Sequence, residues 1–289
     1  MSRISYVNGA YMPHAYAHVP IEDRGYQFSD GIYEVVAYYN QRMLDAAPHL
    51  DRMERSLSEL NIPMPMARRA FELVLQELMR RNRRRNGLLY IQITRGVAAK
   101  RDHAMSGDMM PMVTLSVLPA KIPPAWMRED GCKVVTAPDQ RWTRCDIKSI
   151  SLLANILAKK VSADAGVRET WQLLEDGTVT EGSLSNSYIV KDGVVRTHPT
   201  THAILGGVTR SVTLELARNA GIAVDETPFT LEDIKTADEA FLTSATSNVL
   251  PVVQVDDMVV GDGKPGAVTQ QLMTLFDAHI AEQVGEIHA

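Results

Sequence analysis

Apolar residues follow two different spacings along the N-terminal part of the chain, and each spacing predicts a different element. Short runs rich in β-branched and aromatic residues, typical of strands, cover residues 4–7, 32–39, 88–94 and 113–118. Leu50, Met53 and Leu57 instead recur every three or four positions, as on one face of a helix. They predict a helix over 48–60 that ends before Ile62-Pro63, and the same spacing predicts another over 67–81.

A proline-rich segment follows these elements and predicts a break in the fold. Residues 119–124 read Pro-Ala-Lys-Ile-Pro-Pro, and proline lacks the amide hydrogen that helices and sheets need. We therefore predict a stiff linker over 120–125, between a small N-terminal α/β domain over 1–119 and a larger C-terminal domain over 126–289.

The region beyond the predicted linker mixes short strands with longer helices. Strand patterns cover residues 133–136, 170–174, 187–190, 240–243 and 252–255. Helical patterns cover residues 152–165, 210–219 and 267–283. Because strands and helices do not alternate regularly, the pattern predicts a mixed α/β (α+β) chain of two domains and not a regular βαβ fold.

Charge argues against a nucleic-acid partner. The formal net charge is −5 at neutral pH, which gives no reason to expect a polyanionic ligand. One basic run, Arg80 to Arg85 with Asn82 inside it, follows the helical run 70–79 and precedes Asn86-Gly87. We interpret it as a solvated helix end and predict no nucleic-acid partner.

Cysteine usage and hydropathy favour a cytoplasmic protein. Cys132 and Cys145 are too few for a disulfide framework and suit a reducing compartment. The first residues contain no apolar run of signal-peptide length, and no stretch approaches the roughly 20 apolar residues of a membrane span. We therefore expect a cytoplasmic location and no membrane partner.

The sequence contains no convincing motif for dinucleotide binding, metal binding or serine hydrolysis. The segment Gly261 to Gly266 fits the dinucleotide-binding pattern, but only one helix follows it, so the βαβ unit is missing and a turn is the better interpretation. The histidines and cysteines have no metal-ligand spacing, which predicts no metal site. A serine hydrolase would need a G-x-S-x-G elbow, which the sequence lacks.

Lys148 is the first candidate for chemistry. It stands just before the apolar run 150–157, which must enter a core. A lysine held there would be partly desolvated, which favours the neutral amine that attacks carbonyl groups and forms Schiff bases. The alternative, a lysine whose ammonium reaches solvent from a helix start, is what the local sequence alone favours.

Three further segments concentrate polar residues among apolar neighbours. Glu181 lies in the run 178–186, and a buried carboxylate needs a cation or hydrogen-bond donors, from a ligand or from its own turn. Gly206-Gly207 precedes a predicted helix, where backbone amides bind phosphate, although an ordinary capped loop is equally consistent. The hydroxyl-rich loop 243–248 is uninformative by itself.

Taken in order, these segments resemble the fold-type IV pyridoxal phosphate-dependent transaminases, most closely the D-amino acid (D-alanine) transaminases. The resemblance extends over nearly the whole chain. Its most specific stretches are residues 22–28, 30–35, 49–52, 144–149, 178–183 and 207–210. It implies an enzyme that uses pyridoxal 5′-phosphate to move amino groups between D-amino acids and 2-oxo acids, and a homodimer.

The resemblance also implies the roles of individual residues around the cofactor. Lys148 would form the Schiff base and carry the proton at the substrate Cα as general base and acid. Glu181 would face the pyridine nitrogen, and Leu205 would pack on the ring. The phosphate would be held by the remaining implied residues: Arg52, Val208, Thr209, Ser244 and Ala245. Relatives often have Thr where Ala245 stands, which puts one phosphate hydrogen bond in doubt.

The substrate side of the implied site decides the subfamily. In D-amino acid transaminases, an Arg-x-His at the place of Arg101 and His103, together with the tyrosine matching Tyr33, binds the substrate carboxylate. An arginine fork with two further donors suits that task, although an exposed polar loop is what the local sequence alone favours. The alternatives within the same fold are branched-chain L-amino acid transaminase, (R)-amine transaminase and aminodeoxychorismate lyase.

Overall fold

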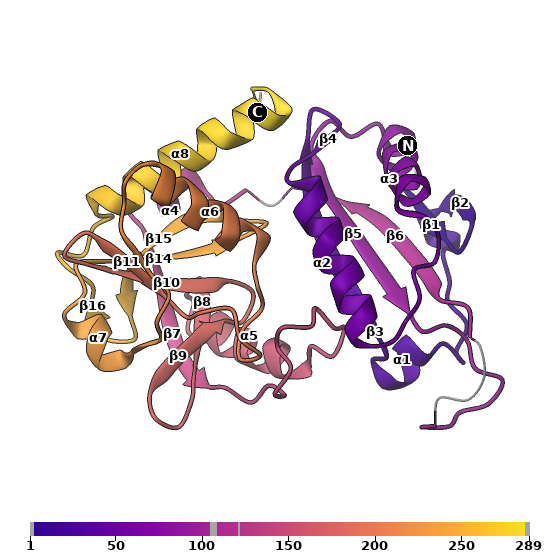
Figure 1. The fold of residues 1–289 in the computed structure, drawn as a ribbon, viewed down its shortest axis with the longest axis horizontal. Coiled ribbons are helices and arrows are strands. Elements are labelled where there is room, and N and C mark those ends of the chain that lie inside the picture. Colours follow the sequence, from indigo (N-terminus) through magenta and orange to yellow (C-terminus); the bar gives the residue numbers. More distant parts are fainter. Residues whose placement is uncertain (1–2, 105–108, 121, 287–289) are drawn as a thin grey trace. The chain divides into compact units, whose positions relative to one another are not determined.

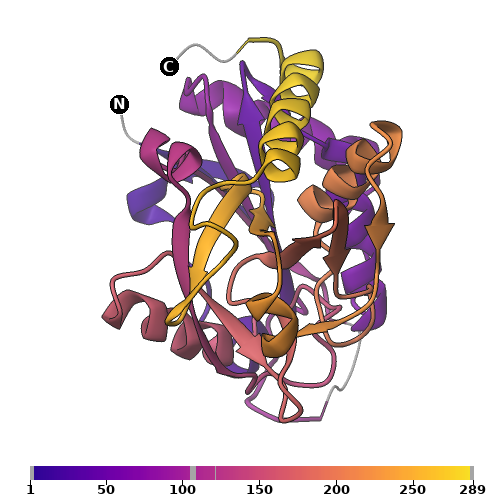
Figure 2. The same cartoon turned by 90° about the vertical axis from the view of Figure 1, so that its left-hand side faces the viewer.

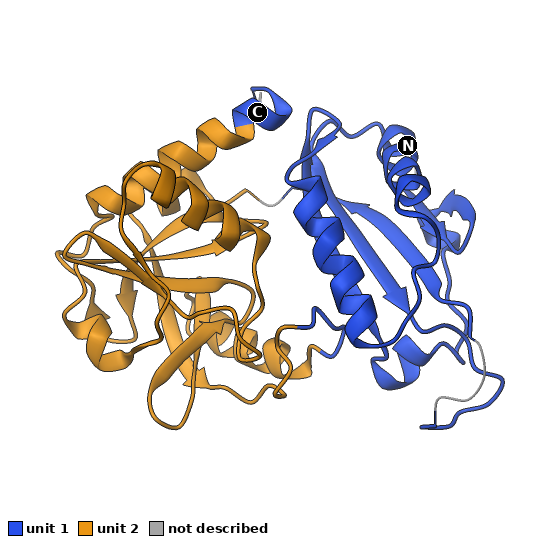
Figure 3. Cartoon of the chain, viewed as in Figure 1, with its two compact units in different colours: residues 1–120, 147–151, 281–289 blue, residues 121–146, 152–280 orange. Residues whose placement is uncertain are grey.

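The computed structural model describes residues 3–104, 109–120 and 122–286, which divide into two compact units. Unit 1 comprises residues 1–120, 147–151 and 281–289, and unit 2 comprises residues 121–146 and 152–280 (Figure 3). Each unit has its own sheet and its own helices (Figure 1).

The described part of unit 1 contains one six-stranded antiparallel sheet. Its strand order is β2 (Ala10–Pro13), β1 (Ile4–Val7), β6 (Met112–Leu118), β5 (Gly87–Thr94), β3 (Gly31–Tyr39) and β4 (Arg42–Met43). The long strands β3 and β5 pair over eight positions, from Gly31 opposite Thr94 to Tyr38 opposite Gly87. This long pairing makes β3 a rigid support for the polar residues that it carries.

Two helices, α2 (Ala46–Glu59) and α3 (Arg68–Asn82), cover the sheet of unit 1 (Figure 1). Alternate residues of β5 and β6 pack against them, because successive side chains of a strand point to opposite faces. This core contains Leu50, Met53 and Leu57 of α2, Phe71, Leu75, Leu78 and Met79 of α3, and Leu89, Ile91, Ile93, Val113, Leu115 and Val117 of the sheet. Two shorter elements are η1 (His14–Tyr16) and α1 (Arg24–Phe28).

Unit 2 is built around a mixed sheet, of which ten strands lie in the described residues. Along the main path the strands are β12 (Val224–Asp225), β11 (Val194–Thr197), β10 (Asn186–Lys191), β14 (Glu239–Ser244), β15 (Asn248–Val255), β7 (Cys132–Pro138), β8 (Glu169–Leu173), β9 (Thr178–Gly182) and β13 (Phe229–Thr230), while β16 (Met258–Val259) pairs with β15. Its helices are α4 (Ala125–Glu129), α5 (Leu153–Asp164), α6 (Val208–Asn219), α7 (Leu231–Lys235) and most of α8 (Ala267–Val284) (Figure 2).

Residues 147–151 belong to unit 1 although both flanking stretches belong to unit 2. Ser149 forms a bridge with Ile32, and the Ile150 N–H donates to Gly31 O at 3.1 Å, so the segment continues the hydrogen bonding of β3. Ile147 is buried in the core of unit 1. The last described turn is also tied to unit 1, where Asn40 Nδ2 donates to Val284 O at 2.9 Å.

These elements confirm the mixed α/β fold class and the predicted strands and helices, with most ends shifted by one or two residues. The residues around Gly261 form a turn, as predicted. The basic run covers the end of α3: Arg80 and Arg81 lie in its last turn, and Arg83 is in the left-handed conformation just after it. No helix in the described ranges is long and apolar enough to cross a membrane. The boundary at 120–125 between independent domains stays a prediction.

Candidate active site

Lys148 is held by its backbone in unit 1. The Tyr33 N–H donates to Lys148 O at 3.0 Å, and the Lys148 N–H donates to the Ser56 hydroxyl at 3.3 Å. The side chain is half-buried, and its Nζ lies 4.3 Å from the centre of the Tyr33 ring. The amine therefore rests on an aromatic face, a contact that attracts a cation and restricts the directions the chain can take.

A buried carboxylate lies one residue from Tyr33. Glu34 is fully buried, and its oxygens accept from Arg52 Nε at 3.0 Å, Arg52 Nη2 at 2.5 Å and His49 Nδ1 at 3.0 Å. Burial by itself raises the pKa of Glu34, but Arg52 and His49 bring that pKa well below its usual value. The carboxylate thus stays ionised and fixes the guanidinium of Arg52 in one orientation.

The residues predicted to bind the substrate carboxylate lie in unit 1 as well. Tyr33 stacks on Tyr90, with ring centres 5.9 Å apart, and burial raises the pKa of Tyr90 to about 12. Arg101 and His103 are exposed and both contact the ring of Phe28. The structure therefore brings Tyr33 beside Lys148 and gathers Arg101 and His103 around a single aromatic side chain.

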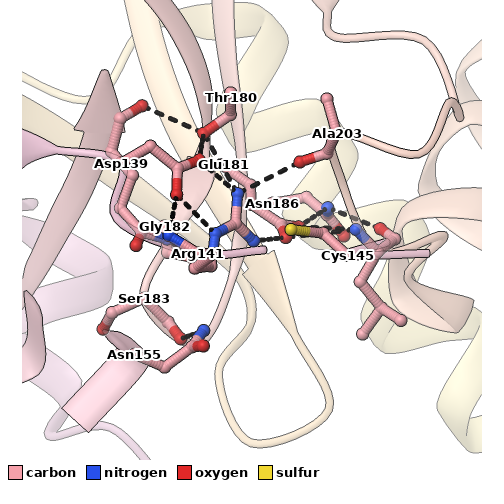
Figure 4. A network of polar contacts seen from close by, with 12 residues as sticks. Asp139, Arg141, Cys145, Asn155, Thr180, Glu181, Gly182, Ser183, Asn186 and Ala203 are labelled. Atoms are coloured by element: carbon pink, nitrogen blue, oxygen red, sulfur yellow. Dashed lines mark hydrogen bonds and ion pairs between the residues drawn. The ribbon is translucent and has the colours of Figure 1, made fainter. Parts of the chain in front are cut away.

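Unit 2 holds the second group of candidate residues, centred on Glu181 (Figure 4). Glu181 lies on β9 and is buried. Its oxygens accept from the Arg141 guanidinium, from Asn186 Nδ2 at 2.9 Å and from the Leu205 N–H at 3.1 Å. Asn186 Nδ2 also donates to Leu205 O at 3.0 Å, so the amide joins Glu181 to the loop before α6.

Arg141 connects Glu181 to a second carboxylate. Its Nε and Nη2 donate to Asp139 at 2.9 and 2.7 Å, and Nη2 also donates to the Thr180 hydroxyl and to Ala203 O. The Thr180 hydroxyl donates to Asp139 at 2.7 Å. All the polar groups in this network have partners, as a buried charged group requires.

Protonation in this network is set by burial and by Arg141. Burial raises the pKa of Glu181, and the nearby Arg141 charge opposes the rise. Burial also acts to raise the pKa of Asp139, but hydrogen bonds from Arg141 bring it below its usual value. The two carboxyl groups that share Arg141 are therefore shifted in opposite directions, the pKa of Glu181 upward and that of Asp139 downward.

The start of α6 has free donors. Gly207 is its N-terminal cap residue and provides no side-chain hydrogen bond, so the first backbone N–H groups have no intrahelical acceptor. Thr209 is buried, and among the described residues its hydroxyl has no recorded partner. A Cβ on Gly207 would lie 2.1 Å from Asn186 Oδ1, so only glycine fits there. These features suit a bound phosphate.

The loop after β14 contributes further hydroxyls in unit 2. Ser244 ends the strand, and its Oγ lies 3.3 Å from Thr246 Oγ1 and accepts the Ser247 N–H at 3.1 Å. Ala245 lies in the turn, and its only hydrogen-bonding groups are those of its backbone. Within the described residues, no three His, Cys, Asp or Glu side chains form a group able to hold a metal ion.

Sequence reasoning overlooked three of the residues that organise these groups. Glu34 had a visible signal, since it shares the inward face of β3 with Ile32 and Val36. Arg141 and Asn186 had none, because the contacts that join them to the rest of the site, from Arg141 to Ala203 O and from Asn186 to Leu205 O, span 62 and 19 positions.

A family comparison now identifies the chain. The model of the family described as amino-transferase class IV matches residues 31–255. The chain belongs to this family. The resemblance to fold-type IV transaminases inferred from the sequence is thereby confirmed, and so is the assignment as a transaminase.

The similarity to curated proteins covers almost the whole chain. D-alanine aminotransferase of Bacillus licheniformis is 38% identical over 279 residues, covering 96% of this chain and 98% of that protein. D-alanine aminotransferase of Listeria monocytogenes is 40% identical over 274 residues, covering 94% of each. D-alanine aminotransferase of Staphylococcus aureus is 37% identical over 275 residues, covering 95% of this chain and 97% of that protein.

Solved structures of similar chains confirm the fold. Branched-chain amino acid aminotransferase of Escherichia coli superposes with a TM-score of 0.91 at 22% identity, covering 100% of this chain and 97% of that one. The branched-chain amino acid aminotransferase of Thermoproteus uzoniensis, solved with norvaline, has a TM-score of 0.86 at 23% identity, covering 98% of this chain and 96% of that one. A further branched-chain enzyme, solved with pyridoxamine 5′-phosphate, has a TM-score of 0.90 at 22% identity, covering 99% and 95%. At this identity the likeness describes architecture and leaves the substrate open.

Proposed function

We propose that the protein transfers amino groups between D-amino acids, such as D-alanine and D-glutamate, and 2-oxo acids, with pyridoxal 5′-phosphate as its cofactor. The observation that carries the proposal is the placement of the Lys148 amine on the ring of Tyr33 at 4.3 Å, in a chain that is 37–40% identical to D-alanine aminotransferases. The amine proposed to react thus lies beside Tyr33, one of the residues proposed to bind the substrate carboxylate.

The residues present fit the cofactor. The uncapped start of α6, the Thr209 hydroxyl and the Ser244-Ala245 turn offer donors for a phosphate, with the Arg52 guanidinium as its cationic partner. Where Thr would add a hydroxyl, Ala245 offers only a backbone N–H.

The ring of the cofactor would use two other residues. Glu181 would accept from the ring nitrogen, and Leu205, whose N–H donates to that same carboxylate, would pack on the ring face. The bound cofactor supplies an electron sink that stabilises negative charge at the substrate Cα.

Lys148 and the carboxylate-binding residues perform the remaining steps. The Lys148 amine takes the proton from the substrate Cα and returns it as acid, so that one lysine serves both directions. Arg101, His103 and Tyr33 bind the substrate carboxylate and so choose which face of Cα is presented to the amine. The handedness of the substrate is therefore decided by the carboxylate contacts.

A half-reaction with D- and L-alanine tests the proposal. We expect the purified protein to show the absorption of bound cofactor, and D-alanine but not L-alanine to convert it to the pyridoxamine form. Lys148→Ala should abolish this conversion, whereas Lys160→Ala, at an exposed pair with Asp164, should leave it unchanged. A protein that stays colourless with added cofactor contradicts the cofactor assignment. Conversion by L-alanine alone would support the branched-chain alternative.

We also propose a homodimer. The side chains of Leu153, Ile156, Leu157 and Val161 are between 40% and 69% exposed along one face of α5. An apolar stripe of this kind is characteristic of an association surface. Sedimentation should show a dimer, and Leu157→Asp should weaken it if α5 contributes. A monomer at micromolar concentration would contradict the proposal.

The cytoplasmic location also stays a proposal, supported by two free and buried cysteines.

A further inference from the structure

A buried arginine holds the main chain of the loop that carries Arg101 and His103. Arg24, at the start of α1, is 4% exposed. Its Nη1 donates to Asp102 O at 2.7 Å and its Nη2 donates to His103 O at 3.3 Å. Because the guanidinium is planar and its donors are fixed relative to one another, the two carbonyls are fixed relative to each other as well.

Arg24 is itself oriented by a shared carboxylate. Its Nε donates to Asp30 Oδ2 at 2.8 Å, and Arg95 donates to both oxygens of Asp30 at 2.8 and 3.0 Å. Arg95 also donates to Leu60 O at 2.8 Å, which ties the group to the end of α2. Asp30 thus keeps a cationic partner even if Arg24 is removed, so a substitution of Arg24 leaves no buried charge unpaired.

Phe28 supports the side chains of the same loop. The guanidinium carbons of Arg24 and Arg101 lie 4.9 and 4.8 Å from the centre of its ring, and the His103 ring centre lies 5.2 Å away. Within the described residues, Arg101 has no carboxylate partner. An exposed arginine that rests on an aromatic face without a counterion is ready to bind an incoming anion.

We propose that Arg24 and Phe28 are positioning residues that set how tightly the enzyme binds the carboxylate of its substrate. Arg24 fixes the main chain at residues 102 and 103, and Phe28 fixes the side chains of Arg101 and His103. Among the described residues, the side-chain hydrogen bonds and ring contacts of Arg24 and Phe28 go to Asp30 and to the loop that carries Arg101 and His103, so we expect the effect to fall on carboxylate-bearing ligands. This inference rests on the proposed function, because it takes Arg101 and His103 as the carboxylate-binding pair.

Inhibition by propanoate isolates this effect from the chemistry, because propanoate has the carboxylate of alanine without its amino group. We expect Arg24→Gln to raise the propanoate inhibition constant of the cofactor-loaded enzyme about tenfold, since a hydrogen-bonded charge is lost. We expect Phe28→Leu to raise it about two- to fivefold, the worth of an exposed cation–π contact. Cofactor absorption and retention should not change in either variant.

Three comparison variants complete the experiment. Arg101→Ala should weaken propanoate binding most. Arg69→Gln should have no effect, because Arg69 is exposed on α3, where it pairs with Glu72. Arg24→Lys should recover part of the loss, since an ammonium can still reach one carbonyl.

The outcomes separate this inference from the proposed function. If Arg101→Ala weakens propanoate binding while Arg24→Gln and Phe28→Leu do not, the positioning role is wrong. The assignment of Arg101 and His103 as carboxylate-binding residues is then unaffected. If the Arg24 and Phe28 variants lose cofactor retention to the same extent as propanoate affinity, the role of both residues is structural only and the inference is also wrong. If the unsubstituted protein shows neither cofactor absorption nor conversion of D-alanine, the proposed function fails first.

Discussion

Replacing Arg141 by alanine would leave two buried carboxylates without their cation. The side chains of Asp139 and Glu181 are each 7% exposed, and both pair with this one guanidinium. Removing one partner of a buried ion pair costs about 3–5 kcal/mol. Since two carboxylates lose their partner here, we expect a loss near the upper end, about 5 kcal/mol in the free energy of unfolding. That is a large share of the roughly 5–15 kcal/mol that stabilises a typical domain.

Urea unfolding followed by tryptophan fluorescence measures this loss, because Trp171 is fully buried in unit 2. The pKa of Asp139 is lowered in the folded protein, so the stability it supplies is present above its unfolded pKa and is lost as pH falls through the folded pKa. Without Arg141 the pKa values of both carboxyl groups rise. Protonation at lower pH then removes the cost of keeping unpaired negative charges buried. The loss should therefore be larger at about pH 8 than at about pH 5.

Two further variants make the result decisive. Arg141→Ala combined with Glu181→Gln should recover part of the lost stability, because one unpaired charge is gone. Arg69→Ala, at an exposed pair with Glu72, should change the free energy of unfolding by less than about 1 kcal/mol. A loss below about 1 kcal/mol for Arg141→Ala, or one independent of pH, would refute the reasoning.

Three other predictions follow from the site. Arg101→Ala should raise KM for D-alanine at least about tenfold with cofactor retention unchanged, and equal loss of both would assign the loop to structure. Glu34→Gln should cost about 3–5 kcal/mol at neutral pH and progressively less in acid, because the lowered pKa of Glu34 stabilises the fold only above its unfolded value; urea unfolding against pH checks this. Gly207→Ala should weaken cofactor binding in a titration, since its Cβ would displace Asn186; unchanged affinity would contradict the assigned phosphate site.

Elements with a clear period could be predicted from the sequence, and elements held by distant polar contacts could not. The apolar face of α2 is visible in Leu50, Met53 and Leu57, which all lie in the core. By contrast, α1 has only five residues and begins with the Asp23 side chain accepting two backbone N–H groups. The strand β9 was missed because two of its buried residues, Thr180 and Glu181, are polar and are hydrogen-bonded to Arg141.

The candidate site shows the same division. For Lys148 the local sequence favours a solvent-reaching lysine, and for Glu181 it leaves the two interpretations even. Only the resemblance to a family selects the catalytic interpretation of both. The partners that organise them could not be read from spacing: Arg141 contacts Ala203, 62 positions away, and Arg24 contacts His103, 79 positions away. Such contacts depend on the order of strands in the sheet, which a single sequence does not specify.

The assignment of residues 147–151 to unit 1 has a consequence for synthesis on the ribosome. A nascent chain that has reached residue 120 lacks Ile147, a member of the core of unit 1, and the segment whose Ser149 bridges to Ile32. Unit 1 therefore cannot complete its packing until part of unit 2 has also emerged. We expect residues 1–120 expressed alone to be less stable than the same unit in the full chain, and Lys148 to reach its place beside Tyr33 only late in folding.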